Sequence, residues 1–316
     1  MAAATAIVAQ PLAAQTEGTD DAKNSRGAFQ IGEAREPMPR GKGDVEKDAE
    51  HETETENLFG FTVGSDTEEA GAVGLAVENV TRFGKRDAKY FALGQKIELA
   101  YGATDNLSVS AALLGDFHRV RPYLGTATFE EVRGRYIFNG VGGELRYRLL
   151  DRRHAPFGLT LHLEPSFARS DDVSGLRGRK FATENKVIFD RALVDDTVFA
   201  ALNLLHEMEW MRGNAGEIER GAKIGASLAL AFRIHPQVFV GMEARYLRAY
   251  DGLGFKTYLG DAIHVGPSVS AKINDKLWIN LAYGGLVGGR EKGSDQRFDL
   301  VRFEKHQIRL KAGYEF

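Results

Sequence analysis

From residue 71 onward, apolar and polar positions alternate along segments of about ten residues, and turn residues separate the segments. A period of two places successive side chains on opposite faces of a β-strand. Strands with one apolar and one polar face are typical of a transmembrane β-barrel. The pattern predicts twelve strands: Gly71–Phe83, Tyr90–Tyr101, Leu107–Phe117, Tyr136–Leu149, Pro156–Ala168, Lys186–Leu193, Thr197–Met211, Ala222–Arg233, Val238–Tyr250, Ala262–Ile273, Leu277–Leu286 and Lys305–Phe316.

The connections between these segments alternate in length. Even-numbered strands are followed by short turns such as residues 194–196 and 274–276, whereas odd-numbered strands are mostly followed by longer polar loops such as 119–135, 169–185 and 287–304. Outer-membrane barrels have tight periplasmic turns and long external loops. Because lipid tolerates no open sheet edge, the first and last strands must pair. The sequence therefore predicts an all-β fold, a transmembrane antiparallel β-barrel of twelve strands.

The last strand carries the most specific signal. One of its faces is apolar and ends on an aromatic residue: Ile308, Leu310, Ala312, Tyr314 and Phe316. The other face, from Lys305 to Glu315, is polar or small. A soluble protein could also end in an amphipathic strand. A terminal Phe, with Tyr two residues before it, resembles the signal that the outer-membrane assembly machinery reads, and we expect that machinery as a partner.

The same alternation assigns charged side chains to the barrel lumen. They carry both signs: Lys96, Glu98, Glu144, Arg146, Arg148, His162, Glu164, Lys223, Arg233, Glu243, Arg245, Lys272, Arg309 and Lys311. These charges could pair with one another and close the lumen, or they could line a narrow polar channel. Small wall residues such as Gly225, Ser227 and Ser268 slightly favour a channel. Replacing Arg146 and Arg148 with neutral residues should then shift ion selectivity towards cations.

Two residues do not fit the assignment of faces. Arg191 of the sixth strand and His206 of the seventh fall among residues that face lipid. Arg191 lies close to a periplasmic turn, where a long side chain can extend to the interface. His206 could mark a β-bulge.

The first 56 residues differ in composition from the rest of the chain. Residues 1–14 are small and apolar, which is typical of the end of a signal peptide. Residues 15–56 are charged and poor in apolar side chains, so we expect a disordered periplasmic segment before a barrel formed by residues 57–316. The chain has no cysteine, as is common in proteins exported through the periplasm. Its net charge of −3 does not suggest a nucleic-acid partner.

No catalytic motif is found. The sequence lacks a Gly-x-Ser-x-Gly elbow, a His-Glu-x-x-His pair and a phosphate-binding loop. His118 lies near Asp116, and His162 shares a face with Glu164, so either pair could act in acid–base chemistry or bind a metal. Neither pair has a third ligand or a nucleophile in the sequence. We therefore predict hydrogen bonding in the lumen, no cofactor, no metal and no enzyme activity.

Three short stretches resemble the beginning of a group of proteobacterial outer-membrane barrels: residues 58–67, 82–87 and 98–110. Members of this group are usually labelled only as outer-membrane or transporter-like proteins. The resemblance extends over residues 58–316 in architecture, but its specific motifs lie in the first third. It implies a barrel and export, and it transfers no site residues.

Together these patterns predict a protein of the Gram-negative outer membrane, surrounded by lipid and lipopolysaccharide. The preferred function is passive passage of small polar or ionic solutes through a narrow lumen of mixed charge. One alternative is a closed structural barrel that binds surface partners through its external loops. The other is a barrel enzyme that modifies lipid or lipopolysaccharide, for which no nucleophile beside a histidine is found.

Overall fold

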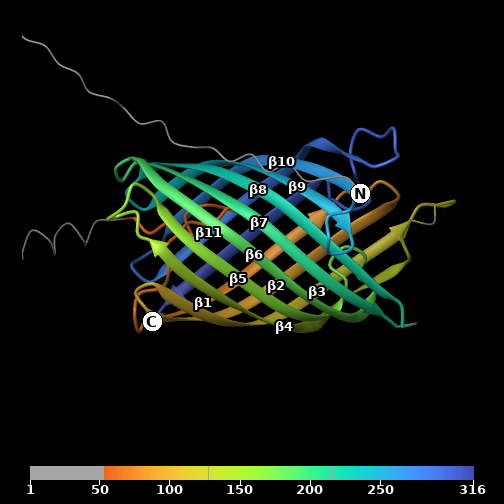
Figure 1. Cartoon of the computed structure of the whole chain (residues 1–316), viewed down its shortest axis with the longest axis horizontal. Coiled ribbons are helices and arrows are strands. Elements are labelled where there is room, and N and C mark those ends of the chain that lie inside the picture. The colour runs from red at the N-terminus through yellow and green to blue at the C-terminus, as the bar shows by residue number, and fades with distance from the viewer. Residues whose placement is uncertain (1–52, 127, 215) are drawn as a thin grey trace, which may run out of the picture. The chain divides into compact units, whose positions relative to one another are not determined.

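The computed structural model describes residues 53–316 except residues 127 and 215. These residues form a closed barrel of antiparallel strands, which are inclined to the long axis of the barrel (Figure 1). The twelve strands are β1 Val73–Phe83, β2 Ala88–Thr104, β3 Leu107–Pro122, β4 Val132–Leu150, β5 Gly158–Ser170, β6 Arg177–Val194, β7 Val198–Gly213, β8 Ile218–His235, β9 Val238–Asp251, β10 Thr257–Lys272, β11 Leu277–Glu291 and β12 His306–Glu315.

Each strand pairs with its neighbours in sequence, and the barrel closes where β1 pairs with β12. At the closure Leu75 of β1 lies opposite Tyr314 of β12 on one side and Leu99 of β2 on the other. The prediction of a twelve-stranded barrel is confirmed. The short connections lie at one end, with the C-terminus, and the longer loops lie at the other (Figure 1). We call these the short-turn end and the long-loop end.

The outer wall of the barrel is apolar and the inner wall is polar. Large apolar side chains remain exposed on the outside, for example Leu113 at 53% and Phe167 at 59%. Between such residues lie buried polar ones, such as His162 of β5 and Asn203 of β7. This arrangement is that of a barrel whose exterior contacts lipid. In the described part of the chain, no helix is long and apolar enough to cross a membrane.

Several strands extend beyond their predicted bounds at the long-loop end. The predicted loop 169–185 is mostly strand, because β5 ends at Ser170 and β6 begins at Arg177. β4 also begins earlier than predicted, at Val132, and β11 ends later than predicted, at Glu291. The ladder of backbone hydrogen bonds continues where both faces are polar, so the apolar alternation that marks a strand is lost before the strand ends.

The two residues that did not fit the pattern lie on the outer wall in a regular register. Asn185 of β6 pairs with His206, and Arg191 pairs with Ala200. No bulge occurs at His206 in the pairing of β7 with β8. The histidine ring instead contacts Phe255, which lies in the connection between β9 and β10, at 5.3 Å between ring centroids.

Residues 53–68 have no regular secondary structure and lie inside the barrel at the short-turn end. We call them the N-terminal plug. The predicted boundary between the N-terminal segment and the barrel, after Glu56, falls within this plug. The proposed signal peptide, residues 1–14, and the rest of the segment up to residue 52 lie outside the described residues.

At the long-loop end, parts of the external loops fold inward. Phe303, in the connection between β11 and β12, is buried in a small apolar cluster with Ala249, Ala262 and Leu286. The neighbouring Glu304 forms an ion pair at 2.9 Å with Lys85, whose side chain is fully buried. Burial disfavours ionisation of Glu304, but Lys85 outweighs that effect and lowers the pKa of the carboxyl to about 2. Both ends of the lumen therefore contain folded chain.

Candidate functional site in the barrel lumen

Wall side chains bind the backbone of the N-terminal plug. Because a segment without regular structure has no backbone partners of its own, its buried N–H and C=O groups need partners from the wall. Glu243 of β9 accepts hydrogen bonds from the N–H groups of Gly60 and Thr62, the second at 2.8 Å. Asn203 of β7 accepts from Val63 N–H at 2.9 Å and donates to Val63 C=O at 2.8 Å. These wall side chains therefore provide hydrogen-bond partners for successive backbone groups of the plug.

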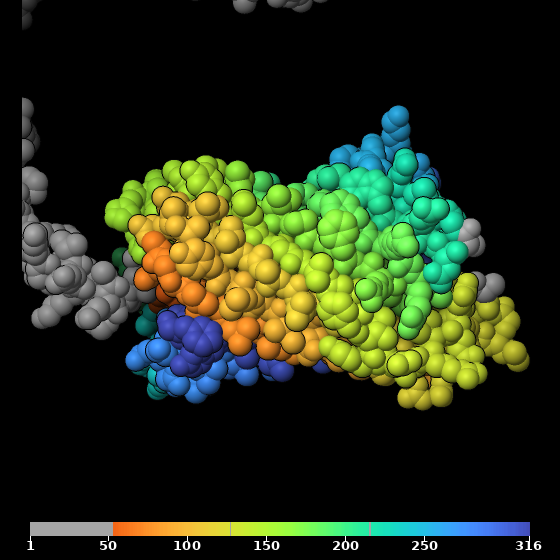
Figure 2. All heavy atoms as spheres, turned by 90° about the horizontal axis from the view of Figure 1, so that it is seen from below, coloured from red at the N-terminus to blue at the C-terminus, as the bar shows by residue number. Residues whose placement is uncertain are grey.

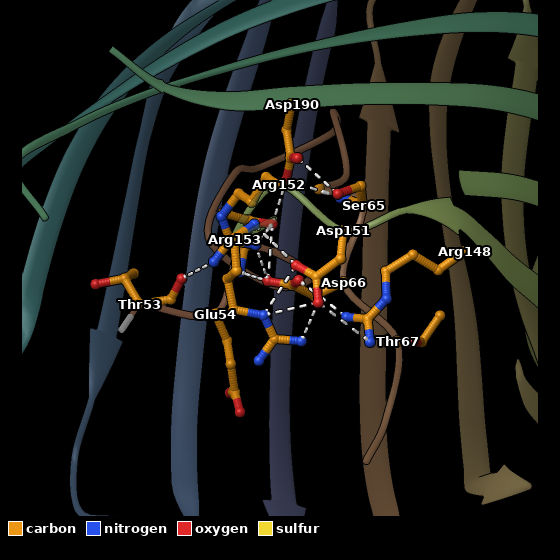
Figure 3. A network of polar contacts seen from close by, with 12 residues as sticks. Thr53, Glu54, Ser65, Asp66, Thr67, Arg148, Asp151, Arg152, Arg153 and Asp190 are labelled. Carbon is orange, nitrogen blue, oxygen red and sulfur yellow. Dashed lines mark hydrogen bonds and ion pairs between the residues drawn. The ribbon is translucent and has the colours of Figure 1, made fainter. Parts of the chain in front are cut away.

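Asp190 of β6 provides the anchor with the most hydrogen bonds from the plug. Its carboxylate accepts hydrogen bonds from Ser65 N–H at 2.9 Å, from Ser65 Oγ at 2.6 Å and from Thr55 Oγ1. Figure 3 shows Asp190 above Ser65, with its carboxylate directed at the plug. Asp190 is 3% exposed, so these bonds are shielded from water. Asp190 is thus a charged wall residue whose hydrogen-bond donors come from the plug.

Asp66 connects the plug to the turn between β4 and β5. In Figure 3 it lies between two guanidinium groups, those of Arg148 and Arg152, and forms ion pairs with both. Thr55 N–H also donates to it at 2.8 Å, and Thr55 Oγ1, whose single hydrogen is shared with Asp190, lies 3.1 Å from it. Burial disfavours the ionised carboxyl, but Arg152 and the Thr55 hydrogen bonds outweigh it and hold the pKa of Asp66 below its ordinary value.

Glu68, at the end of the plug, has the opposite electrostatics. Burial raises the pKa of its carboxyl, and the nearby carboxylates Glu56, Glu315 and Glu54 raise it further. The charge of Lys311 lowers it, and the resulting pKa is about 8. The group is therefore largely protonated at neutral pH. One end of the plug is held by ionised pairs, and the other depends on a carboxyl that stays neutral.

Apolar packing adds a second kind of anchor. Leu58 and Phe59 of the plug are buried in a cluster with wall residues Phe199, Ala201, Ala229, Ala231 and Phe239. Deeper in the lumen, the guanidinium of Arg245 lies 3.7 Å from the ring centroid of Phe61, a cation–π contact. Phe61 is thus the plug residue that meets the charged centre of the lumen.

Several predicted lumen residues are anchors of the plug. Arg146 donates to the C=O groups of Gly64 and Asp66 at 2.7 and 2.8 Å, and Arg309 donates to Gly60 C=O. Lys311 binds Asn57 Oδ1 at 2.9 Å. Arg146 is only 4% exposed. The contacts of Arg146 and Arg148 therefore hold the plug, which differs from the selectivity role expected from the sequence.

Two other predicted lumen residues lie at the short-turn mouth. Lys272 is half exposed and lies 3.5 Å from Glu54. Arg233 contacts Thr53 Oγ1 and lies 3.3 Å from Asp196 in the turn after β6. They position the start of the plug where it enters the barrel.

A cluster around Lys96 crosses the middle of the lumen. The ammonium group of Lys96 lies 2.7 Å from Glu98, 3.0 Å from Glu164 and 3.8 Å from Glu144. His162 Nε2 lies 3.3 Å from Glu144 and 3.8 Å from Glu164. The structure thus adds Glu144 to the His162/Glu164 pair, and these three could hold a cation. Lys96 already supplies positive charge to both carboxylates, so a metal ion would have to displace it.

Beside the plug, four lysine–glutamate pairs keep contact with solvent. They are Lys96–Glu164, Lys186–Glu184, Lys223–Glu207 and Lys180–Glu209, with distances of 3.0 Å or less except for 3.1 Å in the last. Their glutamate side chains remain 19–30% exposed although all lie on the inner wall. We call this set the charged strip. It runs along the inner faces of β5 to β8, with Lys96 reaching it from β2.

His118 and Asp116 are in contact, as the sequence suggested, at 2.9 Å between His118 Nδ1 and the carboxylate. The other ring nitrogen, Nε2, lies 3.0 Å from the C=O of Asp172. Ser170 Oγ donates to Asp116 at 2.8 Å and not to the histidine. Because both ring nitrogens face acceptors, the ring is held as a double donor and has no free lone pair to act as a base.

Strand β12 places its predicted assembly residues on the outer wall. Leu310, Tyr314 and Phe316 are exposed, and Ile308 and Ala312 are half-buried on the same face. The rings of Tyr314 and Phe316 contact each other at 5.1 Å.

The plug and the barrel together coincide with a region recognised across sequences. A family profile matches residues 51–316, a range that contains the plug and all twelve strands. The chain belongs to DUF6662, a family of unknown function. No curated protein sequence matches this DUF6662 chain.

Several solved structures are similar to this chain. The COG4313 outer membrane channel from Pseudomonas putida F1 has a TM-score of 0.56 at 11% identity, and the match covers 80% of the DUF6662 chain and 98% of the channel. LpxR from Salmonella typhimurium has a TM-score of 0.43 at 10% identity, over 76% of this chain and 99% of LpxR. The KdgM porin in complex with disordered oligogalacturonate has a TM-score of 0.43 at 9% identity, over 77% and 99%. At these identities the likeness concerns the fold alone.

Proposed function

We propose that this protein is a narrow channel for small polar or ionic solutes, closed by its own N-terminal plug. The observation that carries the proposal is the charged strip: paired, partly exposed charges that line the inner wall beside the plug. A barrel built only for structure would gain more from an apolar or fully buried interior, because exposed ion pairs contribute little stability. Paired charges of both signs favour weak selectivity.

The contacts of the plug support its role as a gate. Most of them are hydrogen bonds between its backbone and polar wall side chains, which water can replace. Its apolar anchor is small, since Leu58 and Phe59 are its buried large apolar residues. Withdrawal would leave a lumen lined by Glu243, Asn203 and Asp190, all of which water can solvate. Apart from the cluster around Phe199 and Phe239, the plug can therefore leave without exposing apolar surface.

The alternative is a permanently closed barrel that acts through its external loops. The burial of Arg146 and Arg148 against the plug favours it, because separating buried charges from their partners is costly. The two proposals differ in conductance. A gated channel conducts when its plug is loosened, whereas a structural barrel does not conduct in any folded state.

We propose no catalytic role. The double-donor geometry of His118 and the occupation of the Glu144–Glu164 carboxylates by Lys96 support this, since neither group then has a free base near a nucleophile. We place the protein in the Gram-negative outer membrane, with its apolar wall in lipid and lipopolysaccharide. Its partners are then the solute and, through β12, the assembly machinery.

The experiment is single-channel recording in a planar bilayer, on the parent chain and on a variant with a weakened plug. The parent should be closed for most of the recording, with rare openings. The Asp190→Asn variant, which weakens anchors of the plug, should open frequently to a small conductance. Absence of conductance in both folded proteins would reject the channel and favour the closed barrel.

A further inference from the structure

A row of aromatic side chains crosses the outer wall near the long-loop end. Phe167 of β5, Phe181 of β6 and Trp210 of β7 lie side by side, with ring centroids 4.9 Å and 5.5 Å apart. Two residues further towards the long loops, on the same face of each strand, stand Arg169, Arg179 and Arg212. The register places Arg179 beside Arg212 above the aromatic rings, and Arg169 lies next to them where the pairing of β5 with β6 is irregular.

These arginines lack acidic partners. Among the described residues, no carboxylate lies within ion-pair distance of Arg169, Arg177, Arg179 or Arg212. Arg179 and Arg212 are direct partners across β6 and β7. Like charges directly opposite each other destabilise a sheet. An anion from outside the chain would stabilise such an uncompensated pair.

The arginines line two adjoining grooves on the surface. One has a volume of about 430 Å³ and contains Arg135, Tyr136, Phe138, Arg169 and Arg177. The other, of about 830 Å³, contains Arg169, Arg177, Arg179, Arg212 and the backbone near Gly213. Figure 2 shows the outer ends of β4 to β7 next to one another at the right, where the colour passes from yellow-green to teal. We call the two together the arginine groove.

The position of the groove relative to a membrane can be worked out from β7. Its outward residues from Val198 to Trp210 span about 40 Å of strand, or about 30 Å along the membrane normal at a tilt of about 40°. That length matches the hydrocarbon layer, of about 30 Å. Aromatic residues mark the interface, so Arg179 and Arg212, one step beyond, lie at the level of the lipid head groups. At the long-loop end this is the external leaflet.

We propose that the arginine groove binds the phosphorylated head of lipopolysaccharide. Guanidinium groups bind phosphate through paired hydrogen bonds, and several arginines in a row suit a lipid with more than one phosphate. The aromatic row below would pack against the first part of the acyl chains. This site lies on the outer wall, apart from the plug and the charged strip. It rests on the outer-membrane location proposed above but not on conductance.

The test is native mass spectrometry of the purified full chain in detergent with bisphosphorylated lipid A. The double variant Arg179→Gln/Arg212→Gln should bind it at least tenfold more weakly than the parent. The matched control Arg133→Gln/Arg191→Gln removes the same charge, from an exposed residue at the outer end of β4 and from the other end of β6, and should bind like the parent. Heat-modifiable migration on gels checks folding. If the double variant does not fold, Arg169→Gln alone should still weaken binding.

Three further probes separate the sources of binding. Lipid A without phosphates should bind at least tenfold more weakly to the parent, and phosphatidylglycerol, with its single phosphate, more weakly than the bisphosphorylated lipid. Inorganic phosphate at millimolar concentration should not displace the lipid. The proposal fails if the double variant binds like the parent, if the control loses as much binding, or if the phosphate-free lipid binds equally. Full displacement by inorganic phosphate would make this a phosphate site and would also overturn it.

Discussion

The Asp190→Asn substitution tests the gate most sharply at one residue. The two carboxylate oxygens of Asp190 accept three hydrogen bonds from the plug, and Oδ2 takes those of Ser65 N–H and Thr55 Oγ1. An asparagine is almost the same size, so the wall keeps its packing. Its amide oxygen can take the place of Oδ2, and its NH₂ group can donate to the Ser65 hydroxyl. The substitution therefore replaces three hydrogen bonds to a carboxylate by neutral, weaker ones, and the barrel's own ladder is untouched.

The size of the effect follows from the weakening of these three bonds. A hydrogen bond to a charged group contributes about 1.5–3 kcal/mol, and a neutral one about 0.5–1.5 kcal/mol. A loss of about 1 kcal/mol for each bond should cost the docked plug about 3 kcal/mol. Since about 1.4 kcal/mol corresponds to a factor of ten, the fraction of undocked plug should rise about a hundredfold.

Thiol labelling measures that fraction. The chain has no cysteine, so a single introduced thiol reports without background. Thr62 suits this purpose because it is fully buried in the plug and its hydroxyl has no hydrogen-bond partner among the described residues. In the Thr62→Cys background, Asp190→Asn should speed maleimide labelling about a hundredfold.

A matched control keeps this result specific. Asp116→Asn makes the same change in a buried wall carboxylate at the long-loop end, where the plug does not reach, and it should leave the labelling rate unchanged. Equal labelling with and without Asp190→Asn would show that this carboxylate does not hold the plug. Equal acceleration by the Asp116 variant would also count against the gate, because it would indicate general loosening of the barrel.

Three other predictions follow from the same contacts. Replacing Arg146 and Arg148 with Gln should increase the open probability in bilayers, beyond any change in ion selectivity, because both residues hold the plug. The plug should loosen as pH rises from about 4.5 to about 8: the pKa of Glu68 is raised when folded, so its stabilising contribution is complete below its ordinary pKa and is lost as the folded group ionises. Labelling of the Thr62→Cys variant, corrected for thiol ionisation with a small-molecule thiol, should therefore accelerate over this range, and Glu68→Gln should abolish that dependence. Changing Phe316 to Asp should impair insertion, seen as less heat-modifiable protein in the outer membrane; unchanged levels would argue against an assembly signal in β12.

The barrel could be predicted because the same alternation of apolar and polar residues repeats in every strand. Every strand must turn one face to lipid, so alternation recurs twelve times and the parity of loop lengths supports it. The outer ends of β4 and β6 could not be predicted, because above the membrane both faces are wet and alternation disappears. For the same reason Arg169, Arg179 and Arg212 fell in two expected loops, the first two in residues 169–185 and the third after Met211.

The plug could not be predicted, since its contacts are made by backbone groups. Residues 57–68 show no periodicity, and their partners are wall residues far away in sequence. Asp66 of the plug and Arg152 of the turn after β4 were missed. The missed wall residues are Asp190, Asn203 and Asn280, the last of which donates to Phe59 C=O at 2.8 Å. One signal was present in the sequence. Several polar residues fall on inward faces near the short-turn end, and an open channel mouth does not require so many hydrogen-bonding groups there. The lumen charges could be assigned to a face, but the choice between pairing and lining depends on distances that a sequence does not contain.

Gating of the channel by its own plug is best tested by recording single-channel currents from the Asp190→Asn/Thr62→Cys protein in a planar bilayer, before and after a bulky maleimide is added. A gated channel should show frequent small openings before addition. It should show lasting openings afterwards, because a labelled plug can no longer return to its site. A folded protein that becomes fully labelled and still passes no current would contradict gating by the plug.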